Sequence, residues 1–160
     1  MTGRCACGAI RYELTATPLI VHACHCRDCQ RITGSAFALN LWIERRFVEA
    51  TGALPRSFTL RAGSGQGHDV FFCDVCGTTL WSRYHAPPGD TLFVRAGTLD
   101  QPASVAPDVH IFTRSKLPWL ALPEGARSFE AMYGDFAAVW PAERLARFRR
   151  NAAEHPRGES

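Results

Sequence analysis

The sequence lacks three features that would assign it to other classes of protein. No apolar run approaches the roughly 18 residues that a membrane-spanning helix needs, and no apolar segment follows Met1, so neither a transmembrane helix nor a secretory signal is expected. Lysine is nearly absent, because the 18 basic residues include a single lysine, Lys116. Cysteine is absent after Cys76. We therefore expect a cytoplasmic protein, whose thiols stay reduced, with no membrane partner.

The remaining composition is that of one ordinary folded domain. The chain has 160 residues, of which 46% are hydrophobic and 21% charged, so it can form one hydrophobic core. Alternation of apolar and polar residues predicts a strand over residues 10–14. Further strands are expected over residues 36–43, 57–61, 70–73, 78–84, 91–96 and 110–113. Strands at this spacing, with no helices between them, indicate a mainly β protein with antiparallel sheets.

Helical patterns are short and lie mostly near the C-terminus. We expect a helical turn over residues 27–32 and another over residues 44–47. Residues 128–133 and 141–150 are predicted to be helical, the latter with Pro141 at its first position. The polar residues from Asn151 onward are predicted to form a frayed tail.

Seven cysteines are the main chemical feature of the sequence. They fall into three groups, which are Cys5 with Cys7, then Cys24 with Cys26 and Cys29, and finally Cys73 with Cys76. An odd number does not fit a disulfide framework. Two cysteines separated by one or two residues can direct both sulfurs at one ion, and structural zinc sites use four ligands. The first and third groups are therefore predicted to hold one structural zinc.

The middle group supplies three ligands from six residues. Three protein ligands and an open position are typical of zinc that takes part in catalysis. Two alternatives stay open, namely a redox-active triplet and a closed site completed by a histidine. That histidine would come from the following five: His22, His25, His68, His85 and His110. A pairing of the triplet with Cys73 or Cys76 is also chemically allowed.

Taken in order, the three cysteine motifs resemble the glutathione-dependent formaldehyde-activating enzyme family, which also includes centromere protein V. The resemblance is carried by residues 3–8, 24–35, 72–78, 108–112 and 116–119. It implies a complex of twisted antiparallel sheets around a structural zinc, as in methionine sulfoxide reductase B-like proteins, over residues 1–135. Residues 136–160 would add a C-terminal helix and tail to the same domain. It also implies that Cys5, Cys7, Cys73 and Cys76 hold the structural zinc and that Cys24, Cys26 and Cys29 hold the catalytic zinc.

The activity implied by the resemblance is the condensation of formaldehyde with glutathione to S-hydroxymethylglutathione, of the carbon–sulfur lyase type. The triplet zinc would take a small thiol, such as glutathione, into its open position and lower the pKa of that thiol. Acid–base help is expected from a zinc-bound water or from a nearby polar group such as His25, Asp28 or His110. The alternative function is a non-catalytic zinc module for interactions. Methionine sulfoxide reduction is not favoured, because it requires a redox cysteine late in the chain.

Several other residues are predicted to have structural roles. His25 is expected to point away from the metal, as a surface histidine or one close to the site, and His110 to be a core or edge residue. Residues 63–68 are expected to form a flexible turn rather than a phosphate-binding loop. The four tryptophans are expected to be core or semi-buried anchors, and they are Trp42, Trp81, Trp119 and Trp140.

The positive charge of the sequence does not favour a nucleic-acid partner. The formal charge is +3, but seven thiolates and two Zn²⁺ ions would reduce it to zero. The arginines near the C-terminus are expected to lie on a solvated helix, and they are Arg144, Arg147, Arg149 and Arg150.

Overall fold

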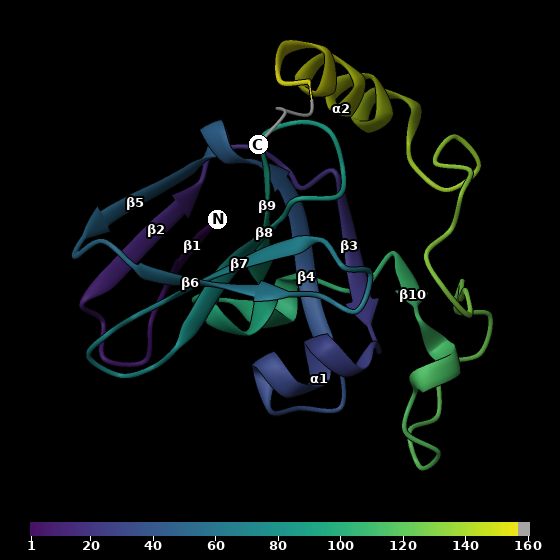
Figure 1. Ribbon diagram of the computed structural model, residues 1–160, viewed down its shortest axis with the longest axis horizontal. Helices are drawn as coiled ribbons and strands as arrows, with labels where there is room; N and C mark the ends of the chain where they lie inside the picture. Colours follow the sequence, from purple (N-terminus) through teal and green to yellow (C-terminus); the bar gives the residue numbers. More distant parts are fainter. Residues whose placement is uncertain (157–160) are drawn as a thin grey trace.

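Two β-sheets account for most of the chain in the computed structural model, which describes residues 1–156 (Figure 1). The smaller sheet has the order β1-β2-β5, and the larger one has the order β10-β3-β4-β9-β8-β7-β6. The strands are β1 (Thr2–Arg4), β2 (Ile10–Leu14), β3 (Ile20–Cys24), β4 (Ala38–Glu44), β5 (Val48–Gly52), β6 (Arg56–Arg61), β7 (Gly67–Phe72), β8 (Thr79–Tyr84), β9 (Thr91–Arg95) and β10 (Val109–Ile111). The helices are α1 (Arg27–Thr33) and α2 (Ala142–Glu154), and 3-10 turns cover Arg45–Phe47, Ala96–Thr98, Pro102–Ser104 and Thr113–Ser115. The prediction of a mainly β protein is confirmed.

Three strands were not expected from the sequence, and the reason is clearest for β3. All five residues of β3 are buried, so the strand shows no alternation of apolar and polar residues. It lies inside the larger sheet, where β4 pairs with it on one side and β10 on the other. The pairing of β10 with β3 is parallel, so the expectation of purely antiparallel sheets is wrong at this edge.

The helix expected over residues 128–133 is also wrong. This segment is irregular and forms a parallel bridge between Ser128 and His110. The N–H of His110 donates to the carbonyl of Arg127 at 2.8 Å, and the N–H of Phe129 donates to the carbonyl of His110 at 2.9 Å. The segment therefore covers the outer edge of β10, and its backbone bonds go to that strand instead of forming a helix.

The C-terminal helix is longer than predicted. Helix α2 continues to Glu154, and the side chain of Asn151 is buried, so the frayed tail does not begin at that residue. The end of the predicted tail, residues 157–160, lies outside the described residues. Within the described part of the chain, no helix has the length and apolar character needed to cross a membrane.

The central strands of the larger sheet, such as β4 and β9, are buried on both faces, whereas the edge strand β6 is exposed. One face packs against the smaller sheet in a core that joins β2 to the larger sheet; here Tyr12 meets Trp81 edge to face at 5.6 Å. Gly3 on β1 leaves room for the Tyr12 ring, since a Cβ at that position would lie 2.4 Å from it. The other face carries Cys24, Ala38 and Trp42 under the two helices and the segment that links β10 to α2. The cysteine triplet belongs to this second face.

Aromatic side chains fill the second core, although one tryptophan departs from the prediction. Trp42 packs edge to face on Trp140 and Phe148, at centroid distances of 5.1 and 5.4 Å. The expectation of buried anchors is thus confirmed for Trp42 and Trp140, and Trp81 is buried in the first core. Trp119 is 72% exposed, so the same expectation is wrong there.

An ion pair with a fully buried carboxylate attaches α2 to the sheet. Glu44, at the end of β4, accepts from Arg147 Nε at 3.1 Å and from a terminal guanidinium nitrogen at 2.6 Å. The same guanidinium donates to the carbonyl of Thr17 at 3.0 Å. Arg147 therefore belongs to the packing of the domain, whereas Arg149 and Arg150 are exposed, as expected of a solvated helix.

Replacing Arg147 by alanine is expected to cost about 3 kcal/mol of unfolding free energy, because it leaves the Glu44 carboxylate buried without a cation. Chemical denaturation of the two proteins measures this difference. Arg150→Ala is the matched control, since it removes an exposed arginine from the same helix, and it should change stability by less than about 0.5 kcal/mol. Equal losses in the two variants would contradict the role assigned to the ion pair.

Candidate metal centres

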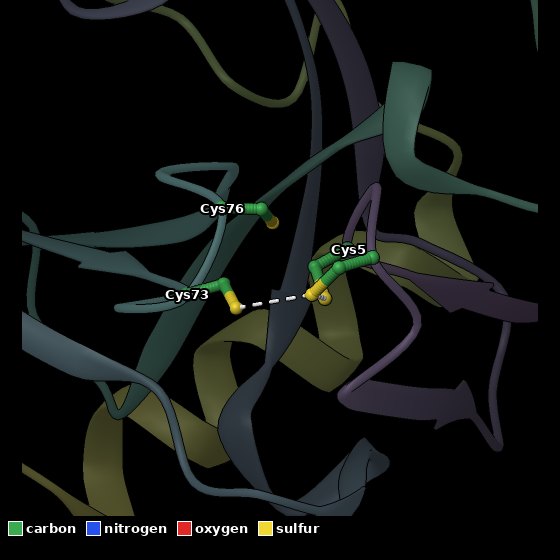
Figure 2. A group of neighbouring side chains, drawn as sticks. Cys5, Cys73 and Cys76 are labelled. Atoms are coloured by element: carbon green, nitrogen blue, oxygen red, sulfur yellow. Dashed lines mark hydrogen bonds between the residues drawn. The ribbon is translucent and has the colours of Figure 1, made fainter.

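The first cysteine group gathers four sulfurs from two distant turns. Cys5 and Cys7 lie between β1 and β2, and Cys73 and Cys76 lie between β7 and β8. All four sulfurs lie within 4.8 Å of one another. Figure 2 shows Cys5 on one turn and Cys73 and Cys76 on the other, with their sulfurs converging on one point. The smaller sheet and the larger sheet are thus joined at this group.

Both turns are closed by the N–H of a glycine that follows the second cysteine, over three residues in the first turn and four in the second. The N–H of Gly8 donates to the carbonyl of Cys5 at 3.0 Å, and the N–H of Gly77 donates to the carbonyl of Cys73 at 2.8 Å. The two glycines adopt φ of 76° and 72°, a left-handed conformation that side chains disfavour. Each turn can therefore present its cysteines side by side.

Thr78 links the two turns, a role that sequence reasoning did not assign to it. Its hydroxyl accepts from the N–H of Ala6 at 3.1 Å, across 72 positions of sequence, and donates to the sulfur of Cys76 at 3.1 Å. Hydrogen bonds from the Thr78 hydroxyl and from its backbone lower the pKa of Cys76 to about 5. This environment favours the thiolate, which is the form of cysteine that binds metals.

The four-sulfur geometry fits zinc. A tetrahedral ion with Zn–S bonds of about 2.3 Å places its ligands about 3.8 Å apart. In the protein, the sulfur of Cys7 lies 3.4 Å from that of Cys5 and 3.7 Å from that of Cys73. Four thiolates also suit zinc rather than magnesium or calcium, which prefer oxygen ligands.

The second group consists of three sulfurs at the junction of β3 and α1. Cys24 ends β3, Cys26 is the N-cap of α1, and Cys29 lies in the first turn of that helix. The three sulfurs lie within 4.8 Å of one another. The N–H of Cys29 donates to the sulfur of Cys26 at 3.3 Å, so the helix cap itself orients one ligand.

The three thiols cannot all ionise independently. Hydrogen bonding to Cys26 and Cys29 raises the pKa of Cys24, whereas hydrogen bonds from Cys24 and Cys29 lower the pKa of Cys26 to about 2. One thiolate is thus stabilised by two neighbouring thiols. A divalent cation would remove this competition, because it allows all three to be thiolates at once. The donor set therefore fits a metal ion.

Within residues 1–156, no histidine or carboxylate joins either cysteine group, and the two groups stay separate. Two of the five candidate histidines, His22 and His25, lie close to the triplet in sequence, but their rings contact other groups. His22 Nε2 lies 2.8 Å from the hydroxyl of Tyr133, and His25 Nε2 lies 3.1 Å from His110 Nδ1. His85 pairs with Asp69 at 2.8 Å. The arrangement matches neither a closing histidine nor a mixed group with Cys73 or Cys76.

His25 is not a surface residue. Its side chain is 0% exposed, and its ring stacks on that of His110 at a centroid distance of 5.4 Å. Burial lowers the pKa of both histidines, to about 4 for His25. Of the two positions expected for His25, the surface is therefore wrong, and the residue lies buried between Cys24 and Cys26 in the chain without joining their group. The expectation of a core or edge position is confirmed for His110.

Two side chains of α1 attach neighbouring loops beside the triplet. Asp28 accepts from the N–H of Gly63 at 2.9 Å, so the turn between β6 and β7 borders the site. Gln30 donates to the carbonyls of His25 at 2.8 Å and Ser115 at 3.0 Å. Sequence reasoning assigned no role to Gln30, because its two acceptors are backbone groups without a residue signature.

A cavity of about 640 Å³ lies beside the C-terminal end of α1. It is bounded by Ile32 to Ser35, by Phe37 to Leu39, by Cys76 to Thr79, and by Arg95 and Gly97. Its volume lies in the range of small-molecule sites, which is about 300–1,000 Å³. The cavity therefore lies between the helix that carries the triplet and the turn that carries Cys76.

The comparisons with known proteins agree with this geometry. A family model described as "Glutathione-dependent formaldehyde-activating enzyme" matches residues 1–115. The matched range contains all seven cysteines and both sheets. A comparison with curated proteins gave no match.

Proposed function

Because the chain belongs to the glutathione-dependent formaldehyde-activating enzyme family, we propose that it adds a small thiol such as glutathione to formaldehyde at the cysteine triplet. The observation that carries this proposal is the triplet itself, which offers three sulfurs and no fourth ligand from residues 1–156. A metal held in this way keeps a position for a substrate, whereas four protein ligands close a site. We therefore assign the structural zinc to Cys5, Cys7, Cys73 and Cys76.

In the proposed reaction, the thiol sulfur attacks the carbonyl carbon of formaldehyde. A carbon–sulfur bond forms, the carbon–oxygen double bond becomes single, and the proton of the thiol ends on the new hydroxyl group. Zinc at the triplet would supply a lowered thiol pKa and a fixed thiolate. The reverse reaction breaks the same carbon–sulfur bond, which gives the lyase type.

The chain's own residues would orient the reactants. Cys24 and Cys29 are buried and held by β3 and α1, so the ligands start from a rigid position. The hydrogen bond that the Gly63 N–H donates to the Asp28 carboxylate holds the turn between β6 and β7 beside α1. All seven cysteines are free thiols. Thiols that bind metal ions must stay reduced, which supports the proposal of a cytoplasmic location.

The test is exchange spectroscopy by NMR on glutathione and formaldehyde, which form their adduct slowly without a catalyst. The zinc-loaded protein should accelerate the exchange between free thiol and adduct, and glutathione should change the spectrum of cobalt bound at the triplet. Cys26→Ser, which lacks one ligand of the triplet, is the control and should show neither effect. If the fully loaded protein accelerates exchange for none of several small thiols, the proposal fails and a non-catalytic zinc module is favoured.

A further inference from the structure

Strand β6 is an open edge of the larger sheet. It pairs with β7 on one side, and no strand of residues 1–156 pairs with its other side. All six of its residues are exposed, including Phe58 at 44% and Leu60 at 39%. The opposite edge of the same sheet, β10, is covered by residues 127–129. An exposed edge that carries apolar side chains is a template for pairing with another strand.

The hydrogen bonds around β6 show which of its backbone groups point away from the sheet. Just beyond the strand, the N–H of Ala62 donates to the carbonyl of Gln66 at 2.9 Å. The N–H of His85 donates to the carbonyl of Gly67 at 3.0 Å, so Gly67, which lies opposite Arg61, bonds to β8 instead of β6. Bonded and non-bonded pairs alternate along an antiparallel ladder. The residues of β6 whose N–H and C=O groups point outward are therefore Ser57, Thr59 and Arg61.

These outward groups are complementary to a second copy of the same strand. Antiparallel pairing about a two-fold axis at Thr59 joins Thr59 to the same residue of the second copy. It also joins Ser57 of each copy to Arg61 of the other. An axis one residue earlier or later leaves one of the three outward residues opposite a position outside β6. The backbone thus selects one register.

The exposed apolar side chains match in this register. Phe58 of each copy lies opposite Leu60 of the other, so the two pairs cover each other's exposed surface. The Phe58 ring already contacts that of Phe72 on β7, at a centroid distance of 5.5 Å, so its position is partly fixed before the copies meet. The apolar contact therefore extends an aromatic cluster that exists in the single chain.

The charges of the strand also match. Arginines at both ends of β6, Arg56 and Arg61, would repel each other in a register that placed them face to face. With the axis at Thr59, Arg61 lies opposite Ser57 and Arg56 lies opposite Ala62. No arginine of one copy faces an arginine of the other.

We propose that two copies of the chain associate through β6, which pairs with itself antiparallel about Thr59 and joins the two larger sheets into one. A second copy is the partner because the edge complements itself in backbone bonds, apolar side chains and charge. The association stops at two copies, since the pairing occupies β6 and the opposite edge of each sheet is covered. A contact centred on one strand is smaller than a standard interface, so we expect a weak dimer.

The first experiment measures the dissociation constant of the dimer by sedimentation equilibrium of the zinc-loaded chain at concentrations up to about 1 mM. Ser57→Arg places like charges opposite Arg61 twice per dimer and should weaken association about fivefold. Ser57→Glu places opposite charges there and should strengthen association about fivefold. Ser104→Arg and Ser104→Glu are the matched controls, because they change the charge equally at an exposed serine outside the sheets, and they should have no effect.

The opposite signs of the two Ser57 substitutions test the register itself. A dimer whose dissociation constant is unchanged by both, or moves in the same direction with both, would overturn the proposal. A chain that remains monomeric at every concentration would also overturn it, and would favour a strand of a different protein as the partner of this edge.

The second experiment removes the central outward N–H. Thr59→Pro lacks this group, which the pairing of β6 with β7 does not use, so the fold should be retained while association is lost. Thr59→Ala is the matched control, because it loses the same hydroxyl bond to Asp69, of 2.7 Å, but keeps the N–H and should still dimerise. A folded Thr59→Pro chain that dimerises as tightly as Thr59→Ala would contradict the proposal. If circular dichroism shows that Thr59→Pro does not fold, the Ser57 substitutions decide.

Neither experiment involves a thiol or formaldehyde, so this proposal and the proposed function can fail separately. A dimer with the predicted response at Ser57 would stand even if the chain catalysed no exchange. A chain that accelerated the exchange as a strict monomer would retain the proposed function and lose the dimer.

Discussion

Cys73→Ser is expected to leave the chain without a cooperative folded state at neutral pH. Cys73 is fully buried, and its sulfur lies among the four that join the turn after β1 to the turn after β7. Structural zinc in small domains contributes roughly 10–16 kcal/mol of apparent binding energy, whereas a domain of this size has a net stability of about 5–15 kcal/mol. Loss of one ligand can therefore remove the whole margin of stability.

Circular dichroism and thermal unfolding with excess zinc measure this effect. The wild type should unfold in one cooperative transition, and Cys73→Ser should show no transition and little β signal. A folded Cys73→Ser protein, with an unfolding midpoint within a few degrees of the wild type, would contradict the structural role of this group. The matched comparison is the same chemical change in the other cysteine group.

Cys26→Ser is expected to remove one zinc and the thiol chemistry while the fold is retained. Cys26 is the N-cap of α1, where its sulfur accepts from the N–H of Cys29. Serine is among the best N-cap residues, so its hydroxyl can accept the same bond and the start of the helix is preserved. Serine is a much poorer zinc ligand than a thiolate, so the site loses its metal.

Elemental analysis should give two zinc ions per chain for the wild type and one for Cys26→Ser. The acceleration of thiol–formaldehyde exchange should fall about 100-fold or more, because a catalytic metal supplies several kcal/mol of barrier lowering. Cys26→Ala should lose the metal as well, together with about 1 kcal/mol of stability from the lost cap. One zinc in the wild type, purified without a chelator, would contradict the open site.

Local patterns in the sequence predict much of the fold. The alternating residues 10–14 form β2 as predicted, because one face of that strand packs on the core and the other faces solvent. The same reasoning misses β3, whose five residues are all buried and so carry no alternation. It also misassigns residues 128–133, where pairing with the edge of β10 outweighs local helix propensity. The errors thus occur where non-local pairing decides the backbone.

The sequence alone favours a division of the cysteines into four and three, and the structure shows the two groups to be separate. A turn of three or four residues fixes how two sulfurs lie relative to each other, so spacing is sufficient to predict that each motif can bind a metal. Spacing likewise predicts that the triplet forms one group, and in the structure Cys24, Cys26 and Cys29 lie at the end of one strand and in the first turn of one helix.

Only the tertiary structure decides what surrounds these motifs. It brings Thr78 to Ala6 across 72 positions, it leaves the histidines outside both groups, and it leaves β6 at an open edge of the larger sheet. These contacts depend on strand order and register, which no local pattern encodes. The physical reason is that ligand spacing is a property of a single turn, whereas the surroundings of a site and the open edge of a sheet depend on every element packed against them.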